Sequence, residues 1–321
     1  MAEEPPRGAV VVTGSGSGVG AATAVALAER GYRVVAAVHS RDRVAGLRRL
    51  IDDRAAAAGG TGPVIDIEEL DVTATAAIPG FVDRVADRHG GLYAVVSNAG
   101  VTGVGTFEDE DVERYRRVFE VNVFGPVALL KAALPHLRAA GGRFVAVGSV
   151  AGVIGLPFQE AYSGSKFALE GILEGFAPVA RRVGVAVSVV EPGPIDTDAV
   201  RTTDWPRIFA GAGPYEAVLR RYVANAAAER NSLPELPRVR TVGEVAAVIA
   251  AVVGSGDPPF RVPATADTRL LLARKLSDVN GRTVAALLGR WLDPAPGTGP
   301  ETNAETNAET NAAERPQETV E

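Results

Sequence analysis

One stretch of the sequence combines a phenol and an amine at a spacing suited to acid–base chemistry. Tyr162 and Lys166 lie in a run, residues 159–183, whose apolar residues recur at helical spacing. Residues four apart share one face of a helix, so the two side chains should project together. A phenol ordinarily titrates near about 10, and an adjacent ammonium lowers that pKa, so the pair could move a proton near neutral pH. Taken alone, the same spacing also fits an ordinary surface pair.

A glycine-rich loop is the second chemical feature of the sequence. Residues 13–20 follow a β-branched run and precede an alanine-rich, helix-prone segment. Glycines let the backbone turn tightly and approach a pyrophosphate, and the N-terminus of a helix supplies free N–H groups. A flexible turn has a similar composition, but the strand–loop–helix context favours a dinucleotide site. The residues predicted to bind the dinucleotide here are Gly14, Ser15, Ser17, Gly18, Val19 and Gly20.

Strand-like and helix-like segments alternate along the chain and would position these residues. The longest predicted helices are residues 111–140, bent or interrupted at Pro135, and residues 159–183. Regular alternation predicts an α/β fold of the Rossmann type, a doubly wound, mostly parallel seven-stranded sheet with helices on both faces. The predicted strands are residues 8–13, 33–38, 64–70, 92–97, 143–148, 185–191 and 260–262.

Composition divides the chain into one folded unit and two polar ends. We predict a single Rossmann-fold domain over residues 8–293, in which the polar segment 194–240 forms a substrate-binding loop or lid. Residues 294–321 contain three copies of Glu-Thr-Asn-Ala, an acidic, low-complexity composition typical of disorder. Residues 1–7 are predicted to be disordered as well.

Charge and residue usage exclude several classes of function. The 321-residue chain has a formal net charge of −6, which argues against nucleic acid or an anionic membrane as the main partner. It has no cysteine, and its three histidines lie far apart, so we expect no disulfide, thiol catalyst or metal site. No apolar run reaches about 18 residues without Gly, Pro or charge, and the N-terminus is unlike a signal peptide. We therefore expect a cytoplasmic protein without a membrane span.

Together these motifs resemble the short-chain dehydrogenase/reductase family. The glycine spacing Thr-Gly-x-x-x-Gly-x-Gly of that family occupies residues 13–20, and Ser97 stands where the family commonly has Asn. The resemblance covers about residues 8–197, and the segment 155–171 is similar to the 17β-hydroxysteroid and retinol dehydrogenase group. Further family motifs follow in order: Asp71-Val72, Asn98-Ala99-Gly100, Asn122, Ser149 thirteen residues before Tyr162, and Pro192-Gly193 with Thr197.

The resemblance implies a role for each of four catalytic residues. Tyr162 would exchange a proton with the substrate oxygen, and Lys166 would lower the phenol pKa and bind the nicotinamide ribose. Ser149 would donate a hydrogen bond to the substrate carbonyl, where negative charge develops. Asn122 would hold a water that connects Lys166 to solvent.

The resemblance also implies a cofactor-binding set beyond the glycine loop. In the family, the position of Asp71 contacts adenine, the position of Asn98 lies beside the cofactor, and the segment 192–197 holds the nicotinamide carboxamide. The predicted residues are His39, Ser40, Arg41, Asp71, Val72, Asn98, Ala99, Gly100, Tyr162, Lys166, Pro192, Gly193, Ile195 and Thr197.

The end of the second predicted strand bears on the choice of nicotinamide. An acidic residue there would bind a ribose 2′-hydroxyl, whereas an Arg would accommodate a 2′-phosphate. This chain has Val38 at that position, followed by His39, Ser40 and Arg41. A hydroxyl and a guanidinium could bind a phosphate together, so NADP(H) is favoured over NAD(H). Asp42 and the lack of a basic residue in the glycine loop argue the other way, and His39 could contact either adenine or the phosphate.

The leading hypothesis is an NADP(H)-dependent oxidoreductase that interconverts a ketone or aldehyde and an alcohol on a hydrophobic, steroid-, retinoid- or polyketide-like substrate. The apolar segment 153–158 and the excursion 194–222 would form the pocket wall. Alternatives are a dinucleotide-binding regulator or scaffold on this fold, an NAD-linked alcohol dehydrogenase, and an isomerase or dehydratase with the same cofactor site. The resemblance also implies a homodimer or homotetramer, in which the long helices 111–140 and 159–183 form the subunit interface.

Overall fold

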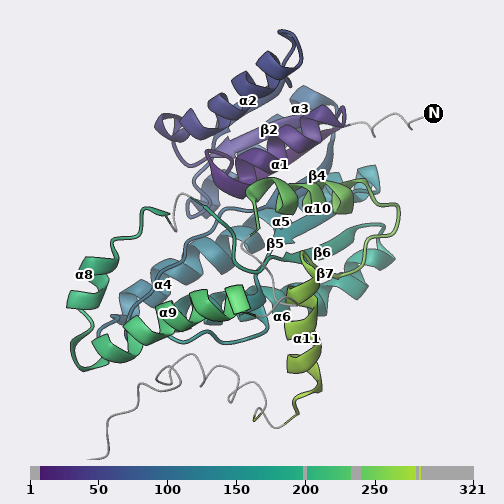
Figure 1. Ribbon diagram of the computed structural model, residues 1–321. Helices are drawn as coiled ribbons and strands as arrows, with labels where there is room; N and C mark the ends of the chain where they lie inside the picture. The colour runs from purple at the N-terminus through teal and green to yellow at the C-terminus, as the bar shows by residue number, and fades with distance from the viewer. Residues whose placement is uncertain (1–7, 198–200, 233–239, 280–281, 283–321) are drawn as a thin grey trace, which may run out of the picture.

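Seven parallel strands form one sheet in the order β3-β2-β1-β4-β5-β6-β7 (Figure 1). The computed structural model describes residues 8–197, 201–232, 240–279 and 282. The predicted Rossmann-type fold is confirmed, and every strand pairing in this sheet is parallel. The strand order reverses between β1 and β4, which is where doubly wound sheets bind ligands. The strands are β1 (Ala9–Thr13), β2 (Arg33–Val38), β3 (Ile65–Glu69), β4 (Leu92–Ser97), β5 (Arg143–Val147), β6 (Ala186–Glu191) and β7 (Arg261–Pro263).

Helices follow most strands and cover both faces of the sheet (Figure 1). Short helical turns join them at η1 (Arg41–Arg43), η2 (Thr75–Ala77), η4 (Val150–Gly152) and η5 (Gly213–Tyr215). The longer helices are α1 (Gly18–Glu29), α2 (Ala45–Ala57), α3 (Ile78–His89), α4 (Val112–Phe119), α5 (Gly125–Ala140), α6 (Glu160–Arg182), α8 (Trp205–Ala210), α9 (Glu216–Ser232), α10 (Val242–Gly254) and α11 (Ala266–Ser277).

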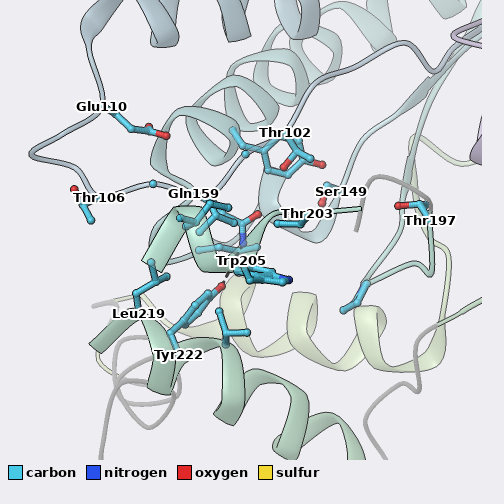
Figure 2. Close-up of a pocket in the computed structure, with 18 of the residues that line it drawn as sticks. Thr102, Thr106, Glu110, Ser149, Gln159, Thr197, Thr203, Trp205, Leu219 and Tyr222 are labelled. Atoms are coloured by element: carbon cyan, nitrogen blue, oxygen red, sulfur yellow. Dashed lines mark hydrogen bonds between the residues drawn. The ribbon is translucent and has the colours of Figure 1, made fainter. Parts of the chain in front are cut away.

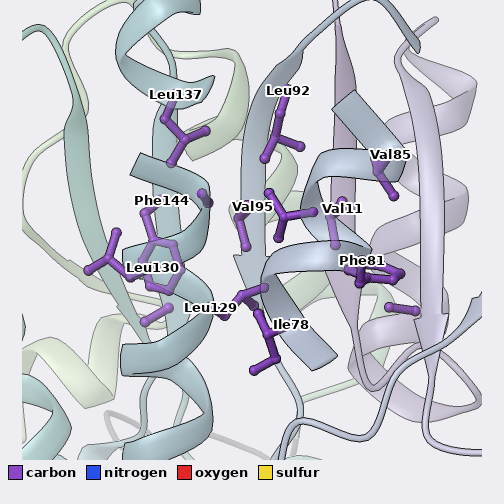
Figure 3. Packing of buried hydrophobic residues seen from close by; sticks show 14 of the residues in the cluster. Val11, Ile78, Phe81, Val85, Leu92, Val95, Leu129, Leu130, Leu137 and Phe144 are labelled. Atoms are coloured by element: carbon purple, nitrogen blue, oxygen red, sulfur yellow. The ribbon is translucent and has the colours of Figure 1, made fainter. Parts of the chain in front are cut away.

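Two apolar layers form because successive residues of a strand point to opposite faces of the sheet. In β1, Val10 and Val12 face the layer built with α1, α2 and α10, whereas Val11 faces the layer built with α3, α5 and α6. Figure 3 shows the second layer, in which Phe144 of β5 packs near Leu129 and Leu130 of α5. Burying one side chain of this size contributes about 1.5–3 kcal/mol. These layers hold the strand ends, and therefore the loops that follow them, in fixed positions.

The long predicted helix 111–140 changes to a π-helix around Asn122 and is not interrupted at Pro135, so the alternative of an interruption at the proline was wrong. A π-helical segment, η3 (Glu120–Phe124), separates α4 from α5, and Pro135 lies inside α5. Pro135 is exposed on α5, so the hydrogen bond that it removes leaves a carbonyl open to solvent. Gly125 and Pro126 directly follow the π segment, where a Cβ on Gly125 would lie 2.9 Å from the carbonyl oxygen of Val72. π segments of this kind are frequent at functional sites.

The helical stretch Val112–Ala140 is long and apolar enough to cross a membrane by length and composition alone. Its apolar side chains Leu129, Ala133 and Leu137 are fully buried against the sheet. A core helix of a globular α/β protein has the same composition, and the burial of these residues accounts for it.

The excursion after β6 is more structured than its sequence suggested. Residues 194–240 include α8, which was not predicted, and α9, which was predicted as 215–230. The Asp204 side chain accepts a hydrogen bond from the Arg207 N–H and caps α8. The predicted terminal helix 280–292 and the two predicted disordered ends lie outside the described residues, except for residue 282.

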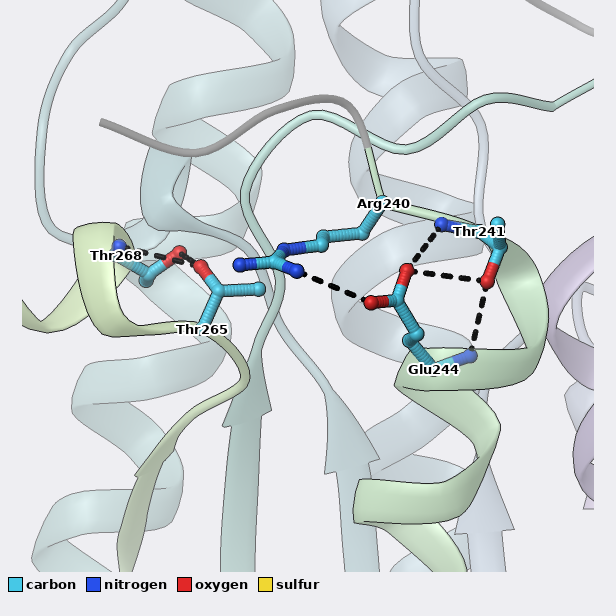
Figure 4. Close-up of polar contacts among 5 residues, drawn as sticks. All are labelled: Arg240, Thr241, Glu244, Thr265 and Thr268. Atoms are coloured by element: carbon cyan, nitrogen blue, oxygen red, sulfur yellow. Dashed lines mark hydrogen bonds and ion pairs between the residues drawn. The ribbon is translucent and has the colours of Figure 1, made fainter. Parts of the chain in front are cut away.

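Side-chain caps fix the start of α10 and α11 (Figure 4). The Thr241 hydroxyl accepts from the Glu244 N–H, and the Glu244 carboxylate accepts from the Thr241 N–H, which completes a capping box. Arg240 donates to the same carboxylate at 3.0 Å. Because α10 packs against α1, this box helps to hold the helix that follows the glycine-rich loop.

Candidate active site

The Ser149, Tyr162 and Lys166 side chains come together where β5 ends and α6 begins. Ser149 caps the turn η4, and its hydroxyl accepts a hydrogen bond from the Ala151 N–H at 3.1 Å. Tyr162 and Lys166 are one helical turn apart on α6, and the Lys166 ammonium lies 5.8 Å from the centre of the Tyr162 ring. The structure therefore brings the three predicted catalytic side chains into one site.

Burial controls the protonation of Tyr162 and Lys166. It raises the pKa of the Tyr162 phenol above its ordinary value, and a hydrogen bond with Ser149 opposes that rise. Burial also lowers the pKa of Lys166 to about 8. The Lys166 ammonium donates to the carbonyl oxygen of Val147 at 2.9 Å. The expectation that the lysine lowers the phenol pKa is therefore not met in this structure, because loss of solvation raises that pKa and, among the described residues, the only opposing contact is the hydrogen bond with Ser149.

Asn122 joins the π segment to two other parts of the site. Its Oδ1 accepts from the Val101 N–H at 2.8 Å, and its Nδ2 donates to the Val101 carbonyl and the Ser165 hydroxyl, each at 2.9 Å. Both amide hydrogens are thus used within the protein, and the water at Asn122 stays a prediction. The side chain fixes the loop after β4 against α6.

The glycine-rich loop has the close packing that a phosphate site needs. A Cβ on Gly14 would lie 2.8 Å from the Ala99 Cα, and one on Gly20 would lie 2.4 Å from the Gly14 carbonyl oxygen. Gly18 has a positive φ of 58° with open space around it. The exposed Ser17 precedes α1 but makes no side-chain cap, so the N–H groups of the first turn point out of the loop uncapped. These donors at a helix N-terminus fit a pyrophosphate.

Two residues of this region lie beneath the loop and not on its surface. Ser15 is fully buried, its hydroxyl donates to the Val12 carbonyl at 2.6 Å, and its N–H donates to the Ala37 carbonyl at 3.1 Å. Its predicted contact with the cofactor is therefore corrected, since both donors are used inside the protein. Thr13, which was not predicted, accepts from the N–H groups of Asn98 and Ala99, each at 3.0 Å.

The loop after β4 packs directly on the glycine-rich loop. The Asn98 amide donates to the carbonyl of Thr13 at 2.9 Å and to that of Gly14 at 3.3 Å. A Cβ on Gly100 would lie 3.3 Å from Asn122 Oδ1 and 3.7 Å from Lys166 Nζ. Asn98, Ala99 and Gly100 therefore connect the predicted phosphate site to the predicted catalytic residues.

Basic side chains gather after β2, as the sequence predicted. Arg41 is exposed, and the Ser40 hydroxyl accepts from the Asp42 N–H at 3.2 Å, which caps η1. The backbone of Arg43 packs directly on the glycine-rich loop, because a Cβ on Gly16 would lie 2.1 Å from its carbonyl oxygen. His39 Nδ1 lies 3.7 Å from Asp71 Oδ1, so the imidazole faces the neighbouring strand end.

The remaining predicted cofactor residues lie at the same carboxyl edge of the sheet. Thr73 donates to Asp71 through its N–H and hydroxyl, and the backbone bond is the largest cause that lowers the Asp71 pKa. Val72 is buried beneath this turn. Beyond β6, the Pro192 carbonyl accepts from the Val150 N–H at 2.9 Å, and Ile195 forms a parallel bridge with Arg240. Gly193, Ile195 and Thr197 line the adjoining cavity.

A cavity of about 1420 Å³ opens beside Ser149 and Tyr162. Figure 2 shows Ser149, Gln159, Trp205 and Tyr222 arranged around it. Its walls include the two segments that were expected to form them, since Ile154 and Leu156 precede α6 and the excursion after β6 supplies α8 and α9. Further apolar side chains lining it are Val104, Ile208, Leu219, Val223 and Leu271.

Gln159 and Tyr222 form a polar contact that the sequence analysis missed. The Gln159 amide donates to the Tyr222 hydroxyl at 3.3 Å, and both residues line the cavity. Phe158, which directly precedes Gln159, has a positive φ of 61°, rare for a residue with a side chain, and its ring lies 5.6 Å from that of Tyr222. Gln159 precedes Tyr162 by nearly one helical turn, a spacing that could have identified it. The partner on α9 is 63 residues away and could not be found that way.

Comparison with known proteins agrees with this geometry. The model of the short chain dehydrogenase family matches residues 8–206, which is more than half of the chain. The chain belongs to the short-chain dehydrogenase family. Over 248 residues, 74% of this chain and 77% of its relative, it is 32% identical to retinol dehydrogenase 8 of Bos taurus. It is 38% identical over 130 residues to 17-beta-hydroxysteroid dehydrogenase type 1 of Homo sapiens, covering 40% of this chain and 39% of that one.

Among solved structures, a short-chain dehydrogenase from Streptomyces avermitilis has a TM-score of 0.64 and 29% identity, covering 88% of this chain and 97% of its own. This short-chain dehydrogenase is therefore an oxidoreductase of a family that binds NAD(P). The predicted likeness to the 17β-hydroxysteroid and retinol dehydrogenase group is confirmed by the two named relatives. The uncapped start of α1 and the tightly packed glycines provide a surface that fits the pyrophosphate of such a cofactor.

Proposed function

We propose that this short-chain dehydrogenase interconverts a ketone or aldehyde and an alcohol on a hydrophobic substrate, with NADP(H) preferred over NAD(H). The observation that carries the proposal is the position of Ser149 and Tyr162 at the wall of a largely apolar cavity. That cavity continues to Gly193, Ile195 and Thr197 beyond β6, where the resemblance places the nicotinamide. The same cavity therefore has space for both the substrate and the nicotinamide.

Each catalytic side chain has a distinct part in the proposed reaction. A bound nicotinamide dinucleotide supplies or accepts the hydride. Ser149 donates a hydrogen bond to the substrate oxygen, and Tyr162 transfers the proton to or from that oxygen. Lys166, which is cationic below about pH 8, binds the ribose. Asn122 keeps Val101 and Ser165 in place around this lysine.

The cavity lining supports a hydrophobic substrate with few polar groups. Ile154, Leu156, Leu219 and Trp205 supply apolar surface on opposing elements. Apolar pockets with a few fixed polar groups bind by burial and orient by hydrogen bonding. A steroid-, retinoid- or polyketide-like molecule has this chemistry, and the names of the two relatives, a retinol and a hydroxysteroid dehydrogenase, support the same class.

The residues after β2 support the preference for NADP(H). No carboxylate ends this strand, and the exposed Arg41 and Arg43 lie on the turn that packs against the glycine-rich loop. A guanidinium binds a phosphate with two parallel hydrogen bonds, whereas a ribose hydroxyl gains little from it.

Separate titrations with NADPH and NADH test the cofactor assignment. We expect NADPH to bind roughly tenfold more tightly or better, a difference of about 1.4 kcal/mol. Arg41→Ala should remove most of that difference, while Arg49→Ala, an exposed arginine farther along on α2, should not. Tighter binding of NADH would instead assign an NAD-linked alcohol oxidation. Binding of neither nucleotide would refute the proposed reaction.

A further inference from the structure

A buried pair of acids lies behind the candidate site, away from the cavity. Glu191 ends β6 and is fully buried, and Glu170 on α6 is 4% exposed. Arg261 of β7 bridges them: its Nη1 lies 3.0 Å from Glu191 Oε1 and also pairs with Glu170. Its Nη2 lies 3.7 Å from Glu174, whose side chain is 62% exposed. We call Glu170, Glu191 and Arg261 the acid–arginine cluster.

The cluster holds two carboxyl groups against one guanidinium. Two carboxylates in a shared, dry site cannot both be ionised at modest cost, so one of them keeps its proton. Burial is the largest cause that raises the pKa of Glu191, to about 8, and the hydrogen bond and charge of Glu170 raise it further. Burial also raises the pKa of Glu170, while the hydrogen bond with Glu191 lowers it. Glu191 is therefore the protonated partner at neutral pH and donates to Glu170.

The same cluster contacts each segment that carries the candidate active site. Glu170 lies two helical turns after Tyr162 on α6, and a Cβ on Gly152 would meet Glu170 Oε2 at 2.7 Å. Gly152 belongs to η4, the turn that Ser149 caps. Glu191 directly precedes Pro192, whose carbonyl accepts from Val150 in that turn.

We propose that the acid–arginine cluster positions Ser149, Tyr162 and the segment after Pro192 relative to one another, and that it does so while it holds one proton. When the proton leaves, two adjacent carboxylates repel each other across the contact between α6 and β6. The η4 turn and the start of the segment after β6 then lose their fixed spacing. This inference rests on the proposed function, since it assigns Glu170 and Glu191 as positioning residues for that reaction.

The surroundings of the pair define its charge balance. Besides Glu170 and Glu191 themselves, Glu174 faces the pair from α6 and Arg261 faces it from β7. From the β5 side it meets glycine: a Cβ on Gly148 would lie 3.8 Å from Glu191 Cγ. Lys166, a buried cation on the same helix, is bonded to the Val147 carbonyl. Arg261 is thus the cation that compensates the cluster, and it cannot balance two carboxylates that are both ionised.

The sign of the pH dependence follows from proton uptake. The pKa of Glu191 is about 8 in the folded protein against an ordinary value of 4.5. Between these values the folded state binds more protons than the unfolded state, so stability falls as pH rises through this window. The stabilisation that Glu191 contributes is fully present below its pKa in the unfolded chain. It is lost as the pH rises through its pKa in the folded protein.

Glu191→Gln is the decisive variant, because the amide still donates to Glu170 but has no proton to release. We expect the urea midpoint of the wild type to fall more steeply from about pH 6 to about pH 9 than that of Glu191→Gln. Glu174→Gln, which removes the exposed carboxylate beside Arg261, should follow the wild-type slope. The infrared C=O band of a protonated carboxylic acid should be present in the wild type at neutral pH and absent in Glu191→Gln. If the urea midpoints of the wild type and Glu191→Gln change with pH in the same way, and the infrared C=O band is the same in both, Glu191 is not the protonated acid.

Kinetics test the positioning part. At about pH 9, one unit above the Glu191 pKa, roughly a tenth of the cluster keeps its proton, so loss of this proton alone should lower wild-type kcat/KM about tenfold from its value at about pH 7. Lys166, whose pKa is about 8, loses its charge over the same range in both proteins, so the alkaline fall of the wild type should exceed that of Glu191→Gln by about tenfold. The same alkaline fall in both proteins would overturn the positioning role.

A second variant and the independent readouts keep the proposal testable. If Glu191→Gln does not fold, Glu170→Gln takes its place, because its amide donates to the Glu191 carboxylate and should flatten the same pH dependence. If the wild type turns over no carbonyl substrate, the proposed function fails. The infrared and stability measurements would still decide whether the cluster holds a proton.

Discussion

Tyr162 and Lys166 lie on one buried face of α6, and burial moves their pKa values in opposite directions. The phenol is held neutral and the lysine loses part of its preference for the charged form. A neutral phenol hydrogen-bonded to Ser149 is ready to give a proton to a substrate oxygen as that oxygen gains negative charge. At the residue scale, burial and the contact with Ser149 thus set the protonation state on which the proposed proton transfer depends.

Tyr162→Phe removes this proton source and little else. We expect kcat to fall by about 10²–10⁴, the usual contribution of a positioned acid–base group. NADPH affinity should stay within about threefold, which a direct titration measures. Tyr32→Phe, a conservative change of a tyrosine that stacks on Tyr93 away from the cavity, is the matched control. Turnover at the wild-type rate in Tyr162→Phe would contradict the assigned role.

Residue types and spacing could predict which residues gather at the site, but not how each one is used. The pattern of Ser149, Tyr162 and Lys166 is local or motif-based, and it was found. Ser15 and Asn122 were also found, but their roles depend on distant backbone partners. The Ser15 N–H donates to the Ala37 carbonyl. The Asn122 side-chain amide accepts from the Val101 N–H and donates to the Val101 carbonyl. A sequence gives no direct measure of such contacts.

At the element scale, α1 packs so closely on the glycine-rich loop before it that a methyl group at position 20 would not fit. A Cβ on Gly20 would lie 2.4 Å from the Gly14 carbonyl oxygen and 2.5 Å from Asn98 Nδ2. The amide at Asn98 is the one that ties β4 to the glycine-rich loop. The direction of α1 therefore depends on the glycine at position 20.

Gly20→Ala should displace α1 and impair the phosphate site. We expect a loss of stability of about 1–3 kcal/mol from overpacking, measured by urea unfolding. NADPH affinity should fall about tenfold or more, because the N–H groups of the first helical turn move with the helix. Gly80→Ala on α3 is the control, since its Cβ would meet only the far end of Arg84 at 3.5 Å. Unchanged affinity in Gly20→Ala would show that these N–H groups do not bind the phosphates.

Regular strands were the easiest elements to predict. The predicted bounds of β2 and β4 match the structure, and those of the other strands differ by one residue at one or both ends, because each strand is an apolar run between turn residues. The interruption of the helix 111–140 was misplaced because proline was taken as the only cause. The π segment at Asn122 is favoured by tertiary contacts with Val101 and Ser165. The helix α8 was missed because six residues are too few to show a period.

For the whole molecule, α6 presents apolar side chains to solvent on the side opposite the sheet. Ile172, Val179 and Val183 follow one another at helical spacing and are 45%, 58% and 44% exposed. Phe124 at the end of η3 is 51% exposed and Phe167 on α6 is 41% exposed. Helices 111–140 and 159–183 were expected to form a subunit interface, and these exposures support that prediction.

Ile172→Glu should convert an oligomer into monomers, because it would place an unpaired charge in the predicted interface. We expect the wild type to sediment as a homodimer or homotetramer at micromolar concentration and the variant to shift toward the monomer mass. Val64→Glu is the control, since Val64 is 84% exposed ahead of β3, away from α6. A wild type that sediments as a monomer would refute the interface. The position of α6 makes the outcome relevant to chemistry, because the same helix carries Tyr162 and Lys166 on its buried face. Subunit contacts on α6 would then stabilise the element on which the acid–base pair depends, and Ile172→Glu should lower the urea midpoint as well as the mass.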